Sequence, residues 1–200
     1  MATDNLQIWN MALGYLKGDN TVDDETENSY EAKKCRLYWD TCLSFVLRDH
    51  LWSFAKKRES LALTGTAPDG WAYQYKYPTD CIKADRIYNS SDPQDQQSDR
   101  LDFEVAANPT GLGKVIWTNE ASAQLIYGIN VTDPLLWTAD FDNALSLYLG
   151  HKLALAIANS SKRSQDLLNL YYATKSTAET NNVREGTKNV DHDADWIDAR

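Results

Sequence analysis

The sequence predicts an α+β protein: an antiparallel helical bundle of about four helices with an inserted antiparallel β-sheet region and an extended C-terminal tail. Apolar residues recur every three or four positions near both ends of the chain, as in helices packed on one face. In the middle they alternate with polar residues, as in strands. The last stretch follows neither period. We therefore expect a bundle from residues 1–55 and 134–182, a β region over 56–133 and a C-terminal arm over 183–200.

Two helices are expected before the β region. The first covers residues 4–17, where apolar residues share one face, and the second covers residues 25–47 after an acidic connector. Negative charge at a helix start is favoured by the helix dipole. Cys35 and Cys42 lie two turns apart on the apolar stripe of the second helix. We interpret them as small core residues rather than reactive thiols.

The β region is indicated by a row of aromatic residues at every second position. Trp71, Tyr73, Tyr75 and Tyr77 alternate with smaller or polar residues until Pro78 ends the pattern. Clusters of Gly and Pro separate this row from the other candidates, as turns would. Further short strands are expected at residues 61–63, 101–105, 115–117 and 123–129, and the polar residues 90–100 are expected to form an exposed connection.

Helical periodicity returns after Pro134. Residues 153–158 are apolar on nearly all sides, so we expect this third helix to lie at the centre of the bundle. A fourth helix begins near residues 161–164 and carries Leu167, Leu168, Tyr171 and Tyr172. Its end is polar and has little to bury, so the bundle is expected to finish by residue 182.

Composition argues against a nucleic-acid-binding, a membrane or a secreted protein. The 200 residues are 42 % hydrophobic and carry a formal net charge of −9. This acidic balance argues against a stable nucleic-acid binder, which needs a basic surface. The densest apolar run is far shorter than the roughly 18 residues of a membrane span, so we expect no membrane partner. The N-terminus lacks the features of a signal peptide, and three cysteines make an odd number, which favours a reducing compartment.

Few residues form a pattern typical of a catalytic, cofactor or metal site, and we expect none of the three. Asp191, Asp193 and Asp195 copy the first ligands of a calcium loop, but Trp196 stands where that loop needs glycine. These carboxylates fit a solvated tail or a partner contact better. His50 is interpreted as a structural histidine at a helix end.

Four segments together resemble a known family. They are Asn10-Met-Ala-Leu-Gly14, Arg48-x-x-x-Trp52-Ser-Phe-Ala-Lys-Lys-Arg58, Trp71-x-Tyr-x-Tyr-x-Tyr-Pro-x-Asp-Cys81, and Phe141-x-x-Ala-Leu-x-x-x-Leu-x-x-Lys-Leu-Ala154. In their order and spacing they resemble the head-to-tail adaptor, or connector, proteins of short-tailed bacteriophages, of the tail tubular protein A type. The resemblance extends over nearly the whole chain.

The resemblance implies a structural virion protein at the junction of capsid and tail, assembled in the host bacterial cytoplasm. Such proteins form a homo-oligomeric ring, typically of twelve copies, between the portal protein and the tail nozzle. The ring lines the passage of double-stranded DNA and supports tail assembly and genome ejection. The C-terminal segment is expected to contact the portal, through Val190, Asp191, Asp193, Asp195, Trp196, Ile197 and Arg200.

Two other functions stay open at this point. One is a small hydrolase with a carboxylate or histidine site between bundle and sheet, which would need converging carboxylates with shifted pKa values. The other is a binding module that uses the aromatic row from Trp71 to Tyr77 as a stacking platform for bases or sugars. A ring subunit instead needs complementary lateral surfaces that close on themselves.

Overall fold

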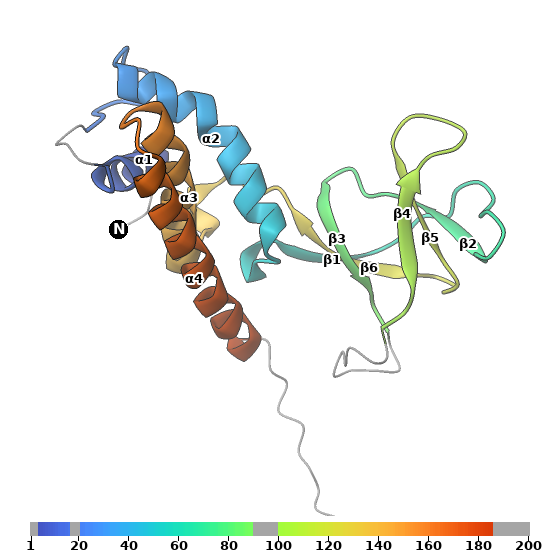
Figure 1. Cartoon of the computed structure of the whole chain (residues 1–200). Coiled ribbons are helices and arrows are strands. Elements are labelled where there is room, and N and C mark those ends of the chain that lie inside the picture. Colours follow the sequence, from blue (N-terminus) through green and yellow to red (C-terminus); the bar gives the residue numbers. More distant parts are fainter. Residues whose placement is uncertain (1–3, 17–20, 90–99, 186–200) are drawn as a thin grey trace, which may run out of the picture.

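A computed structural model describes residues 4–16, 21–89 and 100–185 of the chain. It confirms the predicted α+β class: helices from both ends of the chain form a bundle, and the residues between them form antiparallel sheets. Figure 1 shows the bundle on one side and the β region on the other, with the long second helix leading from one to the other. No helix among the described residues is both long and apolar enough to cross a membrane.

The bundle is built around its third helix, α3. This helix contacts each of the others and is buried on nearly all sides between Phe141 and Gly150. The stretch 153–158, from which the central position was predicted, is less buried, because Leu155 is 51 % exposed and the helix ends at Ala156. Gly150 lies where α3 is closest to its neighbours: a Cβ there would come within 3.3 Å of both the Ala12 carbonyl oxygen and a Leu167 methyl group. The helices are α1 (Asn5–Gly14), α2 (Tyr30–Asp49), α3 (Ala139–Ala156) and α4 (Ser161–Glu185).

Helix boundaries differ from the expected ones where local hydrogen bonds decide them. Helix α2 begins at Tyr30 rather than residue 25, because the Ser29 hydroxyl accepts a hydrogen bond from the Ala32 amide and caps the helix there. The Asp24 carboxylate instead holds a turn by accepting from the Thr26 amide. Helix α4 continues to Glu185, through the stretch predicted to have little to bury, and Ala178 in that stretch is only 2 % exposed.

Six strands form two three-stranded antiparallel sheets, ordered β1-β6-β3 and β2-β5-β4. Together they enclose a second hydrophobic core, separate from that of the bundle, which includes Tyr75, Ile116, Leu125 and Tyr127. The strands are β1 (Lys56–Ser60), β2 (Tyr73–Lys76), β3 (Cys81–Ile87), β4 (Phe103–Ala107), β5 (Lys114–Thr118) and β6 (Gln124–Ile129).

Two strands lie where none was expected, and one expected strand is absent. Strand β1 is almost entirely charged, and strand β3 is broken by two register shifts, so neither shows a clean alternation of apolar residues. Residues 61–63 are not a strand; Leu63 makes a single isolated bridge to Tyr75. The pairing of β1 with β6 therefore depends on the partner strand rather than on local preference.

Tryptophans hold both connections between the bundle and the β region. On the way into β1, the Trp52 indole donates a 2.9 Å hydrogen bond to the Val46 carbonyl. On the way out of β6, the Trp137 indole donates a 3.0 Å bond to the Val131 carbonyl. Trp52 and Trp137 both make edge contacts with the ring of Phe141, at centroid distances of 5.0 and 5.1 Å. The two connections are thus fixed on the same core side chain.

Candidate partner-binding groove

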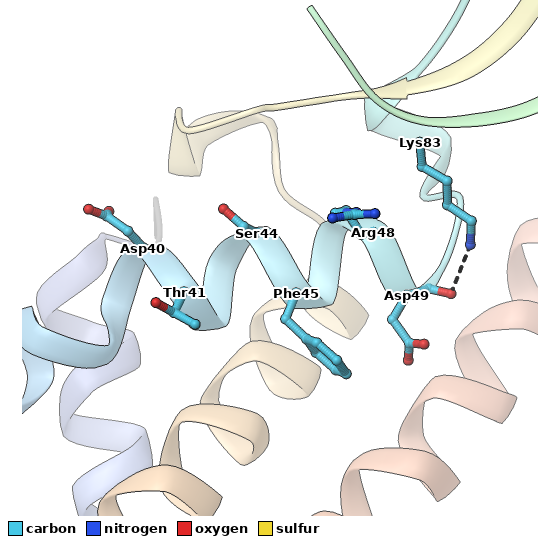
Figure 2. Close-up of a pocket in the computed structure, with 7 residues that line it drawn as sticks. All are labelled: Asp40, Thr41, Ser44, Phe45, Arg48, Asp49 and Lys83. Atoms are coloured by element: carbon cyan, nitrogen blue, oxygen red, sulfur yellow. Dashed lines mark hydrogen bonds between the residues drawn. The ribbon is translucent and has the colours of Figure 1, made fainter. Parts of the chain in front are cut away.

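A groove of about 790 Å³ runs along the exposed side of α2 and reaches β3 (Figure 2). The opposite side of α2 carries Cys35, Cys42 and Val46, which are fully buried in the bundle, so its other residues are left at the surface. The β region then supplies Lys83 as a second wall. The lining residues are Asp40, Thr41, Ser44, Phe45, Arg48, Asp49 and Lys83.

A network of charges closes one end of the groove. The Asp49 carboxylate accepts a 2.7 Å hydrogen bond from the Tyr171 hydroxyl and forms a 2.8 Å ion pair with Lys175, both on α4. The Lys83 ammonium donates to the Asp49 main-chain carbonyl at 3.3 Å, the contact drawn in Figure 2. Burial alone would raise the pKa of Asp49, but the hydrogen bonds from Lys175 and Tyr171 hold it below its ordinary value. The carboxylate is therefore ionised and already satisfied by partners within the chain.

His50 caps the end of α2, as a structural histidine was expected to do. Its ring contacts the Trp52 ring edge-on at 5.0 Å, and its Nδ1 lies 3.6 Å from the Glu179 carboxylate on α4. Burial lowers the pKa of His50, more than the Glu179 charge raises it. The imidazole therefore favours the neutral form in the folded protein. His50 lies beside the charge network and is not among the residues that line the groove.

Apolar side chains accompany the groove on the same helix. Phe45 is 38 % exposed, and its ring stacks on Tyr148 of α3 with centroids 4.3 Å apart. One side of the ring is thus fixed while the rest is open to a partner. Leu37, two turns earlier, is 63 % exposed. Exposed apolar residues beside polar ones are typical of a protein–protein contact.

A second and smaller pocket, of about 340 Å³, lies in the β region beside Glu59 and Asp80. Both carboxylates accept hydrogen bonds from the Tyr127 hydroxyl, at 2.8 and 3.0 Å, and both pair with Lys57. The hydrogen bonds from Lys57 lower the pKa of Glu59 and of Asp80. Two carboxylates held ionised in this way are poor proton donors near neutral pH, so the arrangement does not fit a general acid.

Of the aromatic row from Trp71 to Tyr77, Tyr73 and Tyr75 lie within β2, and Trp71 is half-buried just before this strand. Tyr75 is fully buried in the second core, and Tyr73 and Tyr77 pack against that core from its edge. The Cys81 thiol donates to the Tyr77 hydroxyl at 3.0 Å. The three tyrosines are therefore part of the packing between the sheets, and they do not form one exposed platform.

The residues predicted to contact the portal all lie outside the described part of the chain. These are Val190, Asp191, Asp193, Asp195, Trp196, Ile197 and Arg200. The groove was not predicted from the sequence, although Arg48 stands in one of the segments that carry the family resemblance. Among the described residues, no group of three or more His, Cys, Asp or Glu side chains could hold a metal ion.

No protein-family model matches the chain, and no curated protein matches it significantly.

Proposed function

We propose that this chain is a structural virion protein, the head-to-tail adaptor of a short-tailed bacteriophage. In this role its copies form a ring between the portal protein and the tail nozzle, and DNA passes through the centre of the ring. The protein acts by contact rather than by catalysis. It resides at the junction of capsid and tail after assembly in the bacterial cytoplasm.

The groove along α2 is the observation that carries this proposal. A ring needs two different surfaces on each subunit that complement one another and close on themselves. The exposed side of α2 offers one such surface, with the Phe45 ring, the Arg48 guanidinium and several small polar side chains. We assign the neighbouring subunit to this groove.

The electrostatics of the groove favour a protein partner over a reacting substrate. Its one partly buried carboxylate, Asp49, is ionised and already bound by Tyr171 and Lys175, and its other carboxylate, Asp40, is exposed. The mixture of apolar, hydroxyl and charged groups resembles a typical non-obligate interface. No comparable observation among the described residues supports the hydrolase hypothesis.

The arm was predicted over residues 183–200, but residues 183–185 belong to α4. We therefore assign the contact with the portal to residues 186–200. This segment holds Trp196 beside Ile197, among four aspartates. A tryptophan of this kind is a common anchor of contacts between proteins. The groove and the arm then serve different partners: a second copy of the chain, and the portal.

Electron microscopy of the full-length chain, mixed with the portal protein encoded in the same genome, tests the proposal. A ring attached to the portal is the expected result. Phe45→Asp is expected to prevent ring closure while the circular dichroism spectrum is retained. Leu112→Asp, at a fully exposed position of the β4–β5 turn, is the matched control and is expected to assemble normally.

Deletion of residues 186–200 separates the two contacts. We expect the shortened chain to keep its helical content and to lose binding to the portal. Undiminished portal binding by the shortened chain, or monomers that ignore the portal in the full-length mixture, would contradict the proposal.

A further inference from the structure

The exposed side of α2 carries two opposite charges, placed symmetrically about a small residue. Asp40, Ser44 and Arg48 follow one another at intervals of four positions, so they form one row along the helix. Figure 2 shows the three side chains on the same side of α2. All three residues are exposed. We call Asp40, Ser44 and Arg48 the seam row.

Neither charge of the seam row is paired within the described part of the chain. The Asp40 carboxylate and the Arg48 guanidinium form no hydrogen bond or ion pair with any described residue. They do not reach one another, because eight positions of α-helix separate them by about 12 Å. Asp49 and Lys83, which line the same groove, are both engaged by partners within the chain. Asp40 and Arg48 are therefore the two charges of the groove that are available to a partner.

The order of these charges makes the seam row complementary to itself. When the rows of two copies lie antiparallel, with Ser44 against Ser44, Asp40 of each copy meets Arg48 of the other. Packing of two such rows is the commonest way in which helices of globular proteins pack together. A small side chain at the crossing point lets the two helix axes approach closely. A parallel arrangement in the same register would bring like charges together, which is unfavourable.

Apolar side chains beside the seam row give the contact its area. Leu37 and Phe45 lie on the next row of the helix and are 63 % and 38 % exposed. In the antiparallel arrangement they lie along the seam and are partly removed from water, which favours association. Exposed ion pairs contribute little to affinity, but they disfavour the wrong register. Burial of Leu37 and Phe45 thus supplies the attraction, and the charges of the seam row select the orientation.

We propose that the free chain forms a symmetric dimer through the seam row, with a second copy of the chain on the exposed side of α2. A two-fold contact uses the same surface on both copies, so it closes after two copies and does not extend into a ring. The dimer covers the groove that ring closure needs, and it keeps free chains from closing rings away from the portal. The dimer itself does not depend on the proposed adaptor function; only its competition with the ring does.

Sedimentation equilibrium of the full-length chain, over a wide range of concentrations, measures the dimer. The contact involves one side of one helix, so we expect a weak and reversible dimer. Asp40→Arg turns both attractive pairs of the dimer into repulsive ones, and Arg48→Asp does the same. We expect each single variant to raise the dissociation constant by roughly tenfold or more.

Combining the two charge reversals tests the two-fold symmetry. In the double variant Asp40→Arg/Arg48→Asp, position 40 of each copy again meets the opposite charge at position 48 of the other, so we expect the dimer to return. An equimolar mixture of the two single variants is expected to dimerise for the same reason. A contact without two-fold symmetry would give each residue a different partner, and the dimer would not return in either case.

Lys162→Asp and Asp166→Arg are the matched controls, because they make the same changes of charge at exposed positions of α4. We expect both controls to dimerise as the wild-type chain does. Circular dichroism checks that each variant keeps its helical content, so that a lost dimer is not mistaken for a lost fold.

Three results would overturn the inference: a wild-type chain that stays monomeric at every concentration, single reversals that dimerise like the controls, or failure of either combination to restore the dimer. Ring formation on the portal is followed separately by electron microscopy. A ring formed from a chain that is monomeric when free contradicts only the dimer. A dimer whose chain never forms a ring contradicts only the proposed adaptor function.

Discussion

The hydroxyl of Tyr171 donates a 2.7 Å hydrogen bond to the carboxylate of Asp49, across 122 positions of the sequence. It joins the middle of α4 to the last residue of α2. Burial raises the pKa of Tyr171, and the neighbouring Asp49 charge raises it further, so the hydroxyl keeps its proton and remains a donor. The bond therefore fixes the end of α2, and with it the position of the groove relative to the β region.

Replacing Tyr171 with phenylalanine removes this bond with little change in shape. Because the lost bond is made to a charged acceptor, we expect Tyr171→Phe to lower the free energy of unfolding by about 1.5–3 kcal/mol. Chemical denaturation followed by circular dichroism measures the change. The neighbouring variant Tyr172→Phe, at a half-exposed position, is expected to change it by less than about 0.5 kcal/mol. Equal effects of the two variants would show that the Asp49 bond does not stabilise the fold.

Stability is expected to fall as the solution becomes mildly acidic, because of His50. Burial lowers the pKa of His50 in the folded state below its ordinary value of 6.5. Between these two pKa values the unfolded chain binds more protons than the folded one, so stability rises with pH there. The contribution of His50 is thus complete above about pH 6.5 and is lost as the pH falls below it.

Denaturation midpoints measured at pH values from 7.5 down to 5 test this prediction. We expect His50→Gln to have a shallower loss of stability over this range than the wild-type chain. A wild-type profile that becomes more stable on acidification would require a raised pKa and contradict the structure.

The close packing at Gly150 predicts a strong effect of added volume. A Cβ at this position meets the Ala12 carbonyl oxygen, a Leu167 methyl group and the Tyr15 ring at 3.3 to 3.4 Å. We expect Gly150→Val to lower the free energy of unfolding by about 1–3 kcal/mol, since overpacking forces helices apart. Gly14→Ala is the control, because no atom lies within 4 Å of its added methyl group, and its effect should be small or favourable. Similar melting temperatures for the two variants would refute the assigned close approach.

The cysteines are expected to differ in reactivity. Burial raises the pKa of both Cys35 and Cys42 to about 12, so almost none of either thiol is ionised at pH 8. Cys81 is only partly buried. Alkylation of the native protein, followed by peptide mass spectrometry, should therefore modify Cys81 first, and all three should react after unfolding. Rapid labelling of Cys35 or Cys42 in the native protein would place them outside the core.

The sequence predicted the elements whose pattern follows from their own residues. Apolar residues on all sides of α3 placed it at the centre of the bundle, and the stripe on α2 placed Cys35 and Cys42 in the core. The alternating tyrosines of β2 indicated a strand correctly. The sequence did not show whether these tyrosines face solvent or the core. The packing of the two sheets determines this, because it buries Tyr75 in the second core.

Charged and irregular elements escaped prediction for a physical reason. Strand β1 has no apolar face of its own, and it forms because β6 offers a pairing edge. The register shifts of β3 disturb the alternation that would reveal a strand, and they bring Lys83 and Arg86 to the same face.

By itself the sequence determined the fold class, the order of the helices, and the burial of residues such as Cys35 and Cys42, because local periodicity decides which side chains leave water. The groove depends on the tertiary structure. Arg48 lies on α2 and Lys83 on β3. Only the packing of α2 against β3 brings these two charges together, and no local sequence pattern shows that two residues so far apart in the chain will meet.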